Sequence, residues 1–359
     1  MKKRNDAEGR SIRPHPAFFV TVVLAAVAVS AAVAPGLAVR SPEAGNGPFP
    51  PALPAEAESW EDAIEKIEPQ ALRYILIPEN PTPGEPVTIA VHGVPANSLA
   101  FAVLMSGDRR LGRATFFRVA GRAGGTEVLA TILTVPATVS QSRLSVNLTG
   151  PAGILAEIPL ELAEREFLSE TIRLNPQLTG IITDASPERT AESEHLWAVL
   201  NRVGEEAFHF DAFIPPVEST RRTSHFGSRR VFVNADGRRS TSIHAGVDIG
   251  VPTGTEVHAS GAGRVVMARE RIISGNTVMV EHLPGIYSLY YHLDSIAVKE
   301  GQTVARGAVV GLSGSTGLST GPHLHWEVRV FGENTDPDAF LARPLIDREA
   351  ILGMLEEGN

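Results

Sequence analysis

The sequence of 359 residues contains no cysteine, which excludes a disulfide framework and any thiol chemistry. Basic side chains are fewer than acidic ones, 32 against 41, and the net charge of −9 argues against a general nucleic-acid-binding protein. The motif His-Glu-x-x-His is also absent, which excludes a metallopeptidase helix carrying a glutamate base. A hydrophobic content of 43% is nevertheless enough for two domains with cores of their own.

The charge is unevenly distributed along the chain. Residues 41–218 carry 12 basic and 24 acidic side chains, whereas residues 219–344 carry 13 and 11. The acidity therefore lies in the first region, and the second, which holds the motifs described next, is close to neutral.

Three short motifs in the second region carry residues that can bind a metal. They are His244-Ala-Gly-Val-Asp248, Tyr290-Tyr-His292 and Gly321-Pro-His323-Leu-His325. Imidazole and carboxylate groups are zinc ligands. Residues 324–330 alternate as a strand does, so the two histidines of the His-x-His pair are expected on one face. A single histidine is more often structural than a ligand, and only the combination of motifs predicts a metal site.

With these motifs, residues 219–343 resemble the lysostaphin-like, LytM-type zinc metallopeptidases of peptidase family M23. The resemblance covers about a third of the chain, in the order of the family. The matching segments are Phe226-Gly-Ser-Arg229, His244-Ala-Gly-Val-Asp248, Pro252-Thr-Gly-Thr255, Gly275-Asn-Thr-Val278, Tyr290-Tyr-His292-Leu and Ser319-Thr-Gly-Pro-His323-Leu-His325-Trp-Glu327.

The resemblance implies roles for individual residues. His244, Asp248 and His325 would bind one Zn²⁺ and leave a fourth position open, as in catalytic sites. His292 and His323 would activate water and stabilise the oxyanion, in an order that stays open. Two further residues, Asn276 and Tyr290, are candidates for the substrate groove. For Asn276, turn formation is an equal alternative.

The implied activity is that of a zinc metalloendopeptidase that hydrolyses peptide bonds in the stem or cross-link of peptidoglycan. The alternative is a non-catalytic LytM-type module that activates a cell-wall amidase, although such modules lack ligands that are present here. A third interpretation is a scaffold whose function lies in its N-terminal domain. Which bond would be cut is left open.

The N-terminus is predicted to direct the chain to the cell envelope of a bacterium. In residues 1–40 a basic tail precedes an apolar run that is most hydrophobic between Ala17 and Ala34. This pattern favours an uncleaved membrane helix that anchors the chain in the inner membrane, with the rest of the chain facing the periplasm or the exterior. A cleaved signal peptide, ending at Ala34 or Ala38, is the alternative and would give a secreted protein. Residues 41–68 are rich in proline, glycine and alanine and are expected to be a linker.

The expected fold is mainly β. Residues 69–165 contain short alternating segments separated by turns, which predict a small immunoglobulin-like β-sandwich, either a spacer or a module that binds glycan or an envelope protein. The six expected strands are residues 74–77, 87–91, 100–104, 114–119, 127–133 and 143–148. Residues 166–218 are predicted as a partly helical connector, with a helix opening at Ser186 and running to Asn201. His209 and Asp211 are candidates there for occluding the metal. Residues 219–344 would form an antiparallel peptidase domain, and residues 345–359 a short helix.

Overall fold

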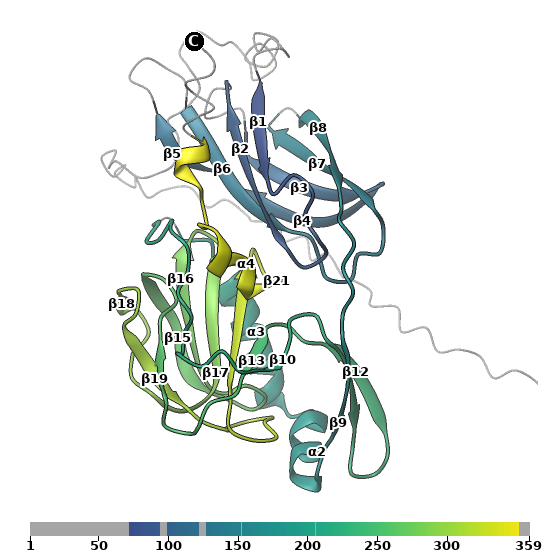
Figure 1. The fold of residues 1–359 in the computed structure, drawn as a ribbon, viewed down its shortest axis with the longest axis vertical. Helices are drawn as coiled ribbons and strands as arrows, with labels where there is room; N and C mark the ends of the chain where they lie inside the picture. The colour runs from purple at the N-terminus through teal and green to yellow at the C-terminus, as the bar shows by residue number, and fades with distance from the viewer. Residues whose placement is uncertain (1–71, 94–98, 122–126, 152, 205, 352–359) are drawn as a thin grey trace, which may run out of the picture. The chain divides into compact units, whose positions relative to one another are not determined.

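Strands dominate the chain in the computed structural model, which describes residues 72–351 except 94–98, 122–126, 152 and 205 (Figure 1). The predicted membrane helix and linker lie outside the described residues. Within the described part, no helix has both the length and the apolar character needed to cross a membrane. The prediction of a mainly β protein is confirmed.

Two four-stranded antiparallel sheets make up the first region, in the orders β1-β2-β6-β5 and β4-β3-β7-β8 (Figure 1). Apolar residues of alternate positions, such as Ile89, Leu104 and Val146, are fully buried between the sheets. This arrangement agrees with the predicted sandwich, and its likeness to immunoglobulin domains stays a prediction. The strands are β1 (Arg73–Ile77), β2 (Pro86–His92), β3 (Phe101–Ser106), β4 (Arg109–Thr115), β5 (Phe117–Gly121), β6 (Glu127–Thr134), β7 (Arg143–Gly150) and β8 (Gly153–Glu161).

The sandwich differs from the prediction in two strands. The segment 114–119, expected as one strand, is divided at Phe116, so that β4 and β5 belong to different sheets. Strand β8 was not expected, because Pro159 interrupts its pattern. A proline is tolerated there because β8 is an edge strand. Proline has no backbone N–H, and on the open side of an edge strand none is needed for pairing.

The connector forms one strand and two helices, β9 (Ser169–Arg173), α2 (Pro176–Thr183) and α3 (Pro187–Leu200). The predicted helix is confirmed as α3, whose Ser186 hydroxyl caps the first turn by accepting from the backbone N–H of Arg189. Its apolar face, including Leu196 and Leu200, packs on Met267, Met279 and Tyr287. Strand β9 pairs in parallel with β11, so the connector is joined to the second region by a sheet.

The second region contains a ten-stranded sheet whose main path is β10-β13-β20-β17-β16-β15-β18, and the hairpin of β11 and β12 that pairs with β9 (Figure 1). Its one described helix between residues 219 and 344 is α4 (Pro337–Ala342), in line with the prediction of little helix. The strands are β10 (Arg222–Ser224), β11 (Arg229–Val233), β12 (Arg239–Ile243), β13 (Val247–Ile249), β14 (Glu256–His258), β15 (Gly263–Arg271), β16 (Gly275–Leu283), β17 (Ile286–Ile296), β18 (Thr303–Val304), β19 (Val309–Ser313), β20 (Leu324–Val330) and β21 (Glu333–Thr335).

The described part of the C-terminal segment packs on the sandwich. Leu345, Ile346 and Ile351 are buried in one apolar cluster with Ala90 and Ile132, which lie on β2 and β6. The backbone carbonyl of Leu345 also accepts a hydrogen bond from the Thr88 hydroxyl, at 3.3 Å. The second face of β2 is therefore covered, which explains why six consecutive residues of that strand are buried.

A buried histidine in β16 predicts loss of stability in acid. His282 is fully buried, with Nδ1 donating to the carbonyl of Ala262 at 2.8 Å and Nε2 2.7 Å from the hydroxyl of Ser288. Burial lowers its pKa to about 3. Between about pH 6.5 and pH 3 the unfolded chain therefore binds a proton that the folded chain does not, and stability falls as the pH falls.

We expect this histidine alone to reduce the free energy of unfolding by about 1–2 kcal/mol between pH 7 and pH 5. Urea unfolding of the wild type and of His282→Gln at several pH values measures this. The variant should start less stable but lose less on acidification. Parallel stability curves for the two proteins would show that His282 does not titrate in this way.

Candidate metal centre and active site

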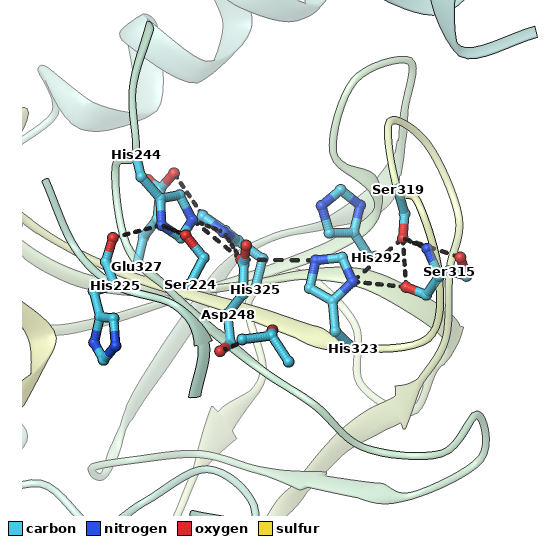
Figure 2. Close-up of polar contacts among 12 residues, drawn as sticks. Ser224, His225, His244, Asp248, His292, Ser315, Ser319, His323, His325 and Glu327 are labelled. Carbon is cyan, nitrogen blue, oxygen red and sulfur yellow. Dashed lines mark hydrogen bonds and ion pairs between the residues drawn. The ribbon is translucent and has the colours of Figure 1, made fainter. Parts of the chain in front are cut away.

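The register of two neighbouring strands brings the first two predicted ligands together. Asp248 in β13 lies directly opposite His325 in β20, and the distance from Asp248 Oδ1 to His325 Nδ1 is 2.7 Å. His244, in the turn before β13, completes the group. Its Nε2 lies 3.1 Å from Asp248 Oδ1 and 3.0 Å from His325 Nδ1. Figure 2 shows the three side chains close together. All three residues are buried. The structure thus brings together the three residues that the motifs predict as ligands.

Hydrogen bonds at the back of each imidazole set which nitrogen faces the centre. His244 Nδ1 donates to the backbone carbonyl of His225, at 2.9 Å, and His325 Nε2 donates to the carboxylate of Glu327, at 3.1 Å. The opposite nitrogens therefore direct their lone pairs toward Asp248 Oδ1. Three acceptors that meet in this way repel one another unless a cation lies between them.

The electrostatics of the group also favour a positive charge. Burial would lower the pKa of His325, but the carboxylates of Asp248 and Glu327 outweigh it and raise that pKa to about 9. Burial would likewise raise the pKa of Asp248, but its close contacts with His244 and His325 hold that pKa well below its usual value. A proton on His325 Nδ1 and a metal ion are thus alternatives for the same position.

The three ligand atoms fit a metal of zinc size. Tetrahedral zinc with bonds of about 2.0–2.1 Å places its ligand atoms about 3.3 Å apart. The separations of 2.7, 3.0 and 3.1 Å need to widen by about 0.6, 0.3 and 0.2 Å to reach this value. Two histidines, one carboxylate and a free fourth position are the donor set of a catalytic rather than a structural zinc site.

The other two histidines lie together on one side of this group. The centres of the His292 and His323 rings are 4.9 Å apart, and His323 Nε2 is 3.7 Å from Asp248 Oδ1 (Figure 2). His292 Nδ1 donates to the carbonyl of Thr316, at 2.7 Å, and His323 Nδ1 donates to that of Gly321, at 2.8 Å. Each Nε2 is therefore left as an acceptor.

Both of these imidazoles are neutral near pH 7. Burial, together with the neighbouring His323 and His325, lowers the pKa of His292 to about 3. Burial also lowers the pKa of His323. The site thus combines three candidate metal ligands with two neutral groups that can accept a proton.

Comparison with known proteins agrees with this geometry. The model of peptidase family M23 matches residues 242–337. Residues 242–337 are a peptidase M23 domain. The chain is 44% identical over 118 residues to the peptidoglycan DD-endopeptidase ShyA of Vibrio cholerae. This match covers 33% of this chain and 27% of ShyA. The DD-carboxypeptidase/endopeptidase Mpg of Neisseria meningitidis is 40% identical over 124 residues, 34% of this chain and 28% of Mpg.

The chain spans little more than a quarter of the length of these two relatives, ShyA and Mpg. A crystal structure of a protein from Pseudomonas aeruginosa assigned to peptidase M23 covers more. It is similar over 73% of this chain and 94% of its own, with a TM-score of 0.51 and 23% identity. This similarity shows the fold, and it extends well beyond the M23 domain.

A residue of the connector supports the metal centre from outside the M23 domain. Glu170 in β9 lies opposite Arg230 in β11, and its Oε2 accepts from Arg230 Nε at 3.2 Å. Arg230 also donates to Asp248 Oδ2, at 2.5 Å. Asp248 is therefore left with one oxygen, Oδ1, for a metal. Neither Glu170 nor Arg230 belongs to a predicted motif, and only the pairing of β9 with β11 reveals them.

The backbone of His292 departs from a regular strand. Tyr291, the preceding residue in β17, stacks on His325 with ring centres 5.2 Å apart. In a regular strand the next side chain would point to the opposite face. His292 instead has a φ of 58°, in the left-handed region, next to a register irregularity of β17. This conformation lets His292 share the face of the metal ligands.

One loop of the M23 domain, residues 315–321, holds both catalytic candidates, because its carbonyls at Thr316 and Gly321 accept from the two imidazoles. The loop packs tightly on the turn that precedes β16. A Cβ atom at Gly317, whose φ is 71°, would lie 2.4 Å from the backbone nitrogen of Gly275. Glycine is therefore required at this contact.

The two residues predicted for the substrate groove both form hydrogen bonds within the domain. Tyr290, predicted to line the groove, is wholly buried, and its hydroxyl accepts from the backbone N–H of Ser260 at 2.7 Å. This prediction is wrong, because strand alternation turns Tyr291 rather than Tyr290 toward the metal ligands. Asn276, in β16, donates from Nδ2 to the carbonyls of Leu293 and Asp294 in β17, at 3.1 and 3.0 Å. These bonds tie two strands together and form no local turn, and contact with substrate stays a prediction.

His209, predicted as a candidate occluding ligand with Asp211, lies elsewhere. Its ring stacks on Phe213 at 5.7 Å and packs near His282. The group of described residues that could hold a metal consists of His244, Asp248 and His325 alone. The structure therefore does not place His209 at the metal centre.

Substitution of Gly317 should impair the site more than the fold. We expect Gly317→Ala to move the 315–321 loop and to lower kcat about 10–100-fold, because small misplacements of catalytic groups are costly. Hydrolysis assays and thermal unfolding measure the two effects. Gly301→Ala is a matched control, since Gly301 has a φ of 85° but open space around its Cβ position. Equal loss of activity in both variants would contradict this role of the loop.

Proposed function

We propose that the chain is a zinc-dependent endopeptidase that hydrolyses peptide bonds in peptidoglycan. The observation that carries the proposal is the juxtaposition of the buried His244, Asp248 and His325 group with two neutral imidazoles. The names of the relatives, a DD-endopeptidase and a DD-carboxypeptidase/endopeptidase, support peptidoglycan as the substrate. The same names favour a cell-envelope location.

In this proposal the zinc ion, when bound, supplies Lewis acidity that lowers the pKa of water and polarises the scissile carbonyl. His323 is the better general base of the two, because its Nε2 lies 3.7 Å from the ligand oxygen of Asp248. His292, with a pKa of about 3, is a weak base and is better suited to orient the attacking water by accepting its second hydrogen.

The remaining proton transfer also falls to His323. Once it has accepted a proton on Nε2, the imidazolium can stabilise the developing oxyanion and then deliver the proton to the leaving amine. The hydrogen bond from Nδ1 to the carbonyl of Gly321 keeps the ring in one orientation through both transfers. Completeness of the ligand group supports an enzyme over a binding module without metal.

Metal removal tests the proposal most directly. The purified full-length chain should release soluble muropeptides from sacculi, a chelator should abolish release, and added zinc should restore it. We expect His325→Ala to lose both bound zinc and activity, measured by elemental analysis and by chromatography of the released peptides. Release that persists in the chelator, with no metal bound, would refute the metallopeptidase.

The two catalytic histidines can be separated from the ligands by metal content. His323→Ala should keep about one zinc per chain and lose about 10²–10⁴-fold in kcat, as expected for removal of a general base. His258→Ala is the matched control, because His258 lies in the M23 domain on β14, where its side chain is 31% exposed and pairs with Glu256. Full activity of His323→Ala would exclude the proposed base.

A further inference from the structure

A polar cavity adjoins the catalytic histidines on the side of the connector. Its volume is about 350 Å³, within the range of small-ligand sites. The end of β9 and the start of α2 form one wall, and the 315–321 loop forms the other. The polar side chains that line it are those of Arg173, Asn175, Gln177, Ser315, Ser319 and Thr320.

The cavity and the catalytic site share part of their structure. The Ser319 hydroxyl lies 3.3 Å from His323 Nδ1 and donates to the carbonyl of Gly321 at 2.8 Å. Ser315 lies 3.0 Å from Ser319, between their hydroxyl oxygens, and Figure 2 shows both beside the two imidazoles. A peptide cleaved next to His323 therefore has the cavity within reach of its neighbouring residues.

The charge of the cavity favours an anion. Arg173 is the one charged side chain among its lining residues, and no acidic side chain lines it. Within the described part of the chain, the exposed guanidinium of Arg173 has neither a hydrogen bond nor an ion pair. Guanidinium groups bind carboxylates through two parallel hydrogen bonds, and the surrounding amide and hydroxyl groups can complete such a contact.

The position of Arg173 is fixed by the strand that also supports the metal centre. Arg173 is the last residue of β9 and pairs with Val233 of β11, and the next backbone N–H, that of Leu174, donates to the Val233 carbonyl at 2.9 Å. On the same strand, Glu170 contacts Arg230 at 3.2 Å. One element outside the M23 domain thus lines the cavity and also contacts Arg230, which donates to Asp248.

We propose that this cavity is a substrate subsite in which Arg173 binds a free carboxylate of the peptide being cut. The inference rests on the proposed peptidase function and adds to it a chemical preference that the connector, not the M23 domain, determines. Two sources of carboxylate share this chemistry, the C-terminus of the peptide and an acidic side chain within it.

The experiment compares three versions of one soluble cross-linked peptide with the full-length protein: unmodified, amidated at the C-terminus, and amidated at the acidic side chain. The wild type should cleave the unmodified peptide with a kcat/KM about tenfold above that for the version lacking the bound carboxylate, mainly through KM. The amidated peptide that is cleaved about tenfold less efficiently shows which of the two carboxylates Arg173 binds. Arg173→Gln should abolish the preference, and Arg173→Lys should restore part of it.

The matched control is Arg143→Gln, since the side chain of Arg143 is 83% exposed and lies in the sandwich. Equal rates for all three peptides, or equal loss on all three in Arg173→Gln, would overturn the subsite while leaving the peptidase intact. Binding of the same peptides to His323→Ala, measured by calorimetry, separates the two proposals. A dissociation constant that rises about tenfold when Arg173→Gln is added supports the subsite even if the wild type cleaves nothing.

Discussion

The antiparallel register of β13, β20 and β17 is the constraint on which the active site depends. It sets Asp248 opposite His325, and His325 opposite Tyr291, so that one row across the sheet holds two candidate metal ligands and the ring that stacks on one of them. A shift of one residue in either pairing would turn a ligand to the other face. The fully buried Trp326, next to His325, opposes such a shift because it would be brought to the site side.

Around this row, the surrounding groups act by fixing orientation. Glu327 and the carbonyl of His225 select the imidazole nitrogens that face the centre, and Arg230 occupies the second oxygen of Asp248. The 315–321 loop does the same for the two catalytic candidates. A metal centre arranged in this way loses little side-chain entropy on binding an ion, because hydrogen bonds already hold its candidate ligands in one orientation.

How much of this could be predicted depends on the range of the interactions. Ligand identity is local: His244 and Asp248 belong to one motif, and strand alternation places His323 and His325 on one face. The same alternation could not settle Tyr290 against Tyr291, because the face that β17 presents depends on its pairing with β20. Nor could it predict that a left-handed residue at His292 would return that side chain to the site, since such strain is sustained only by surrounding contacts.

The sequence by itself determined the mainly β composition, the helix that begins after Ser186 and the absence of thiol chemistry, and it predicted the three candidate metal ligands. Each follows from residue type or from short-range periodicity. Tertiary structure alone decided that β9 pairs with β11, which brings Glu170 to Arg230 and Arg173 to the cavity beside His323. Contacts between residues about 60 to 150 positions apart leave no periodic signal in the chain, because they depend on which strands become neighbours.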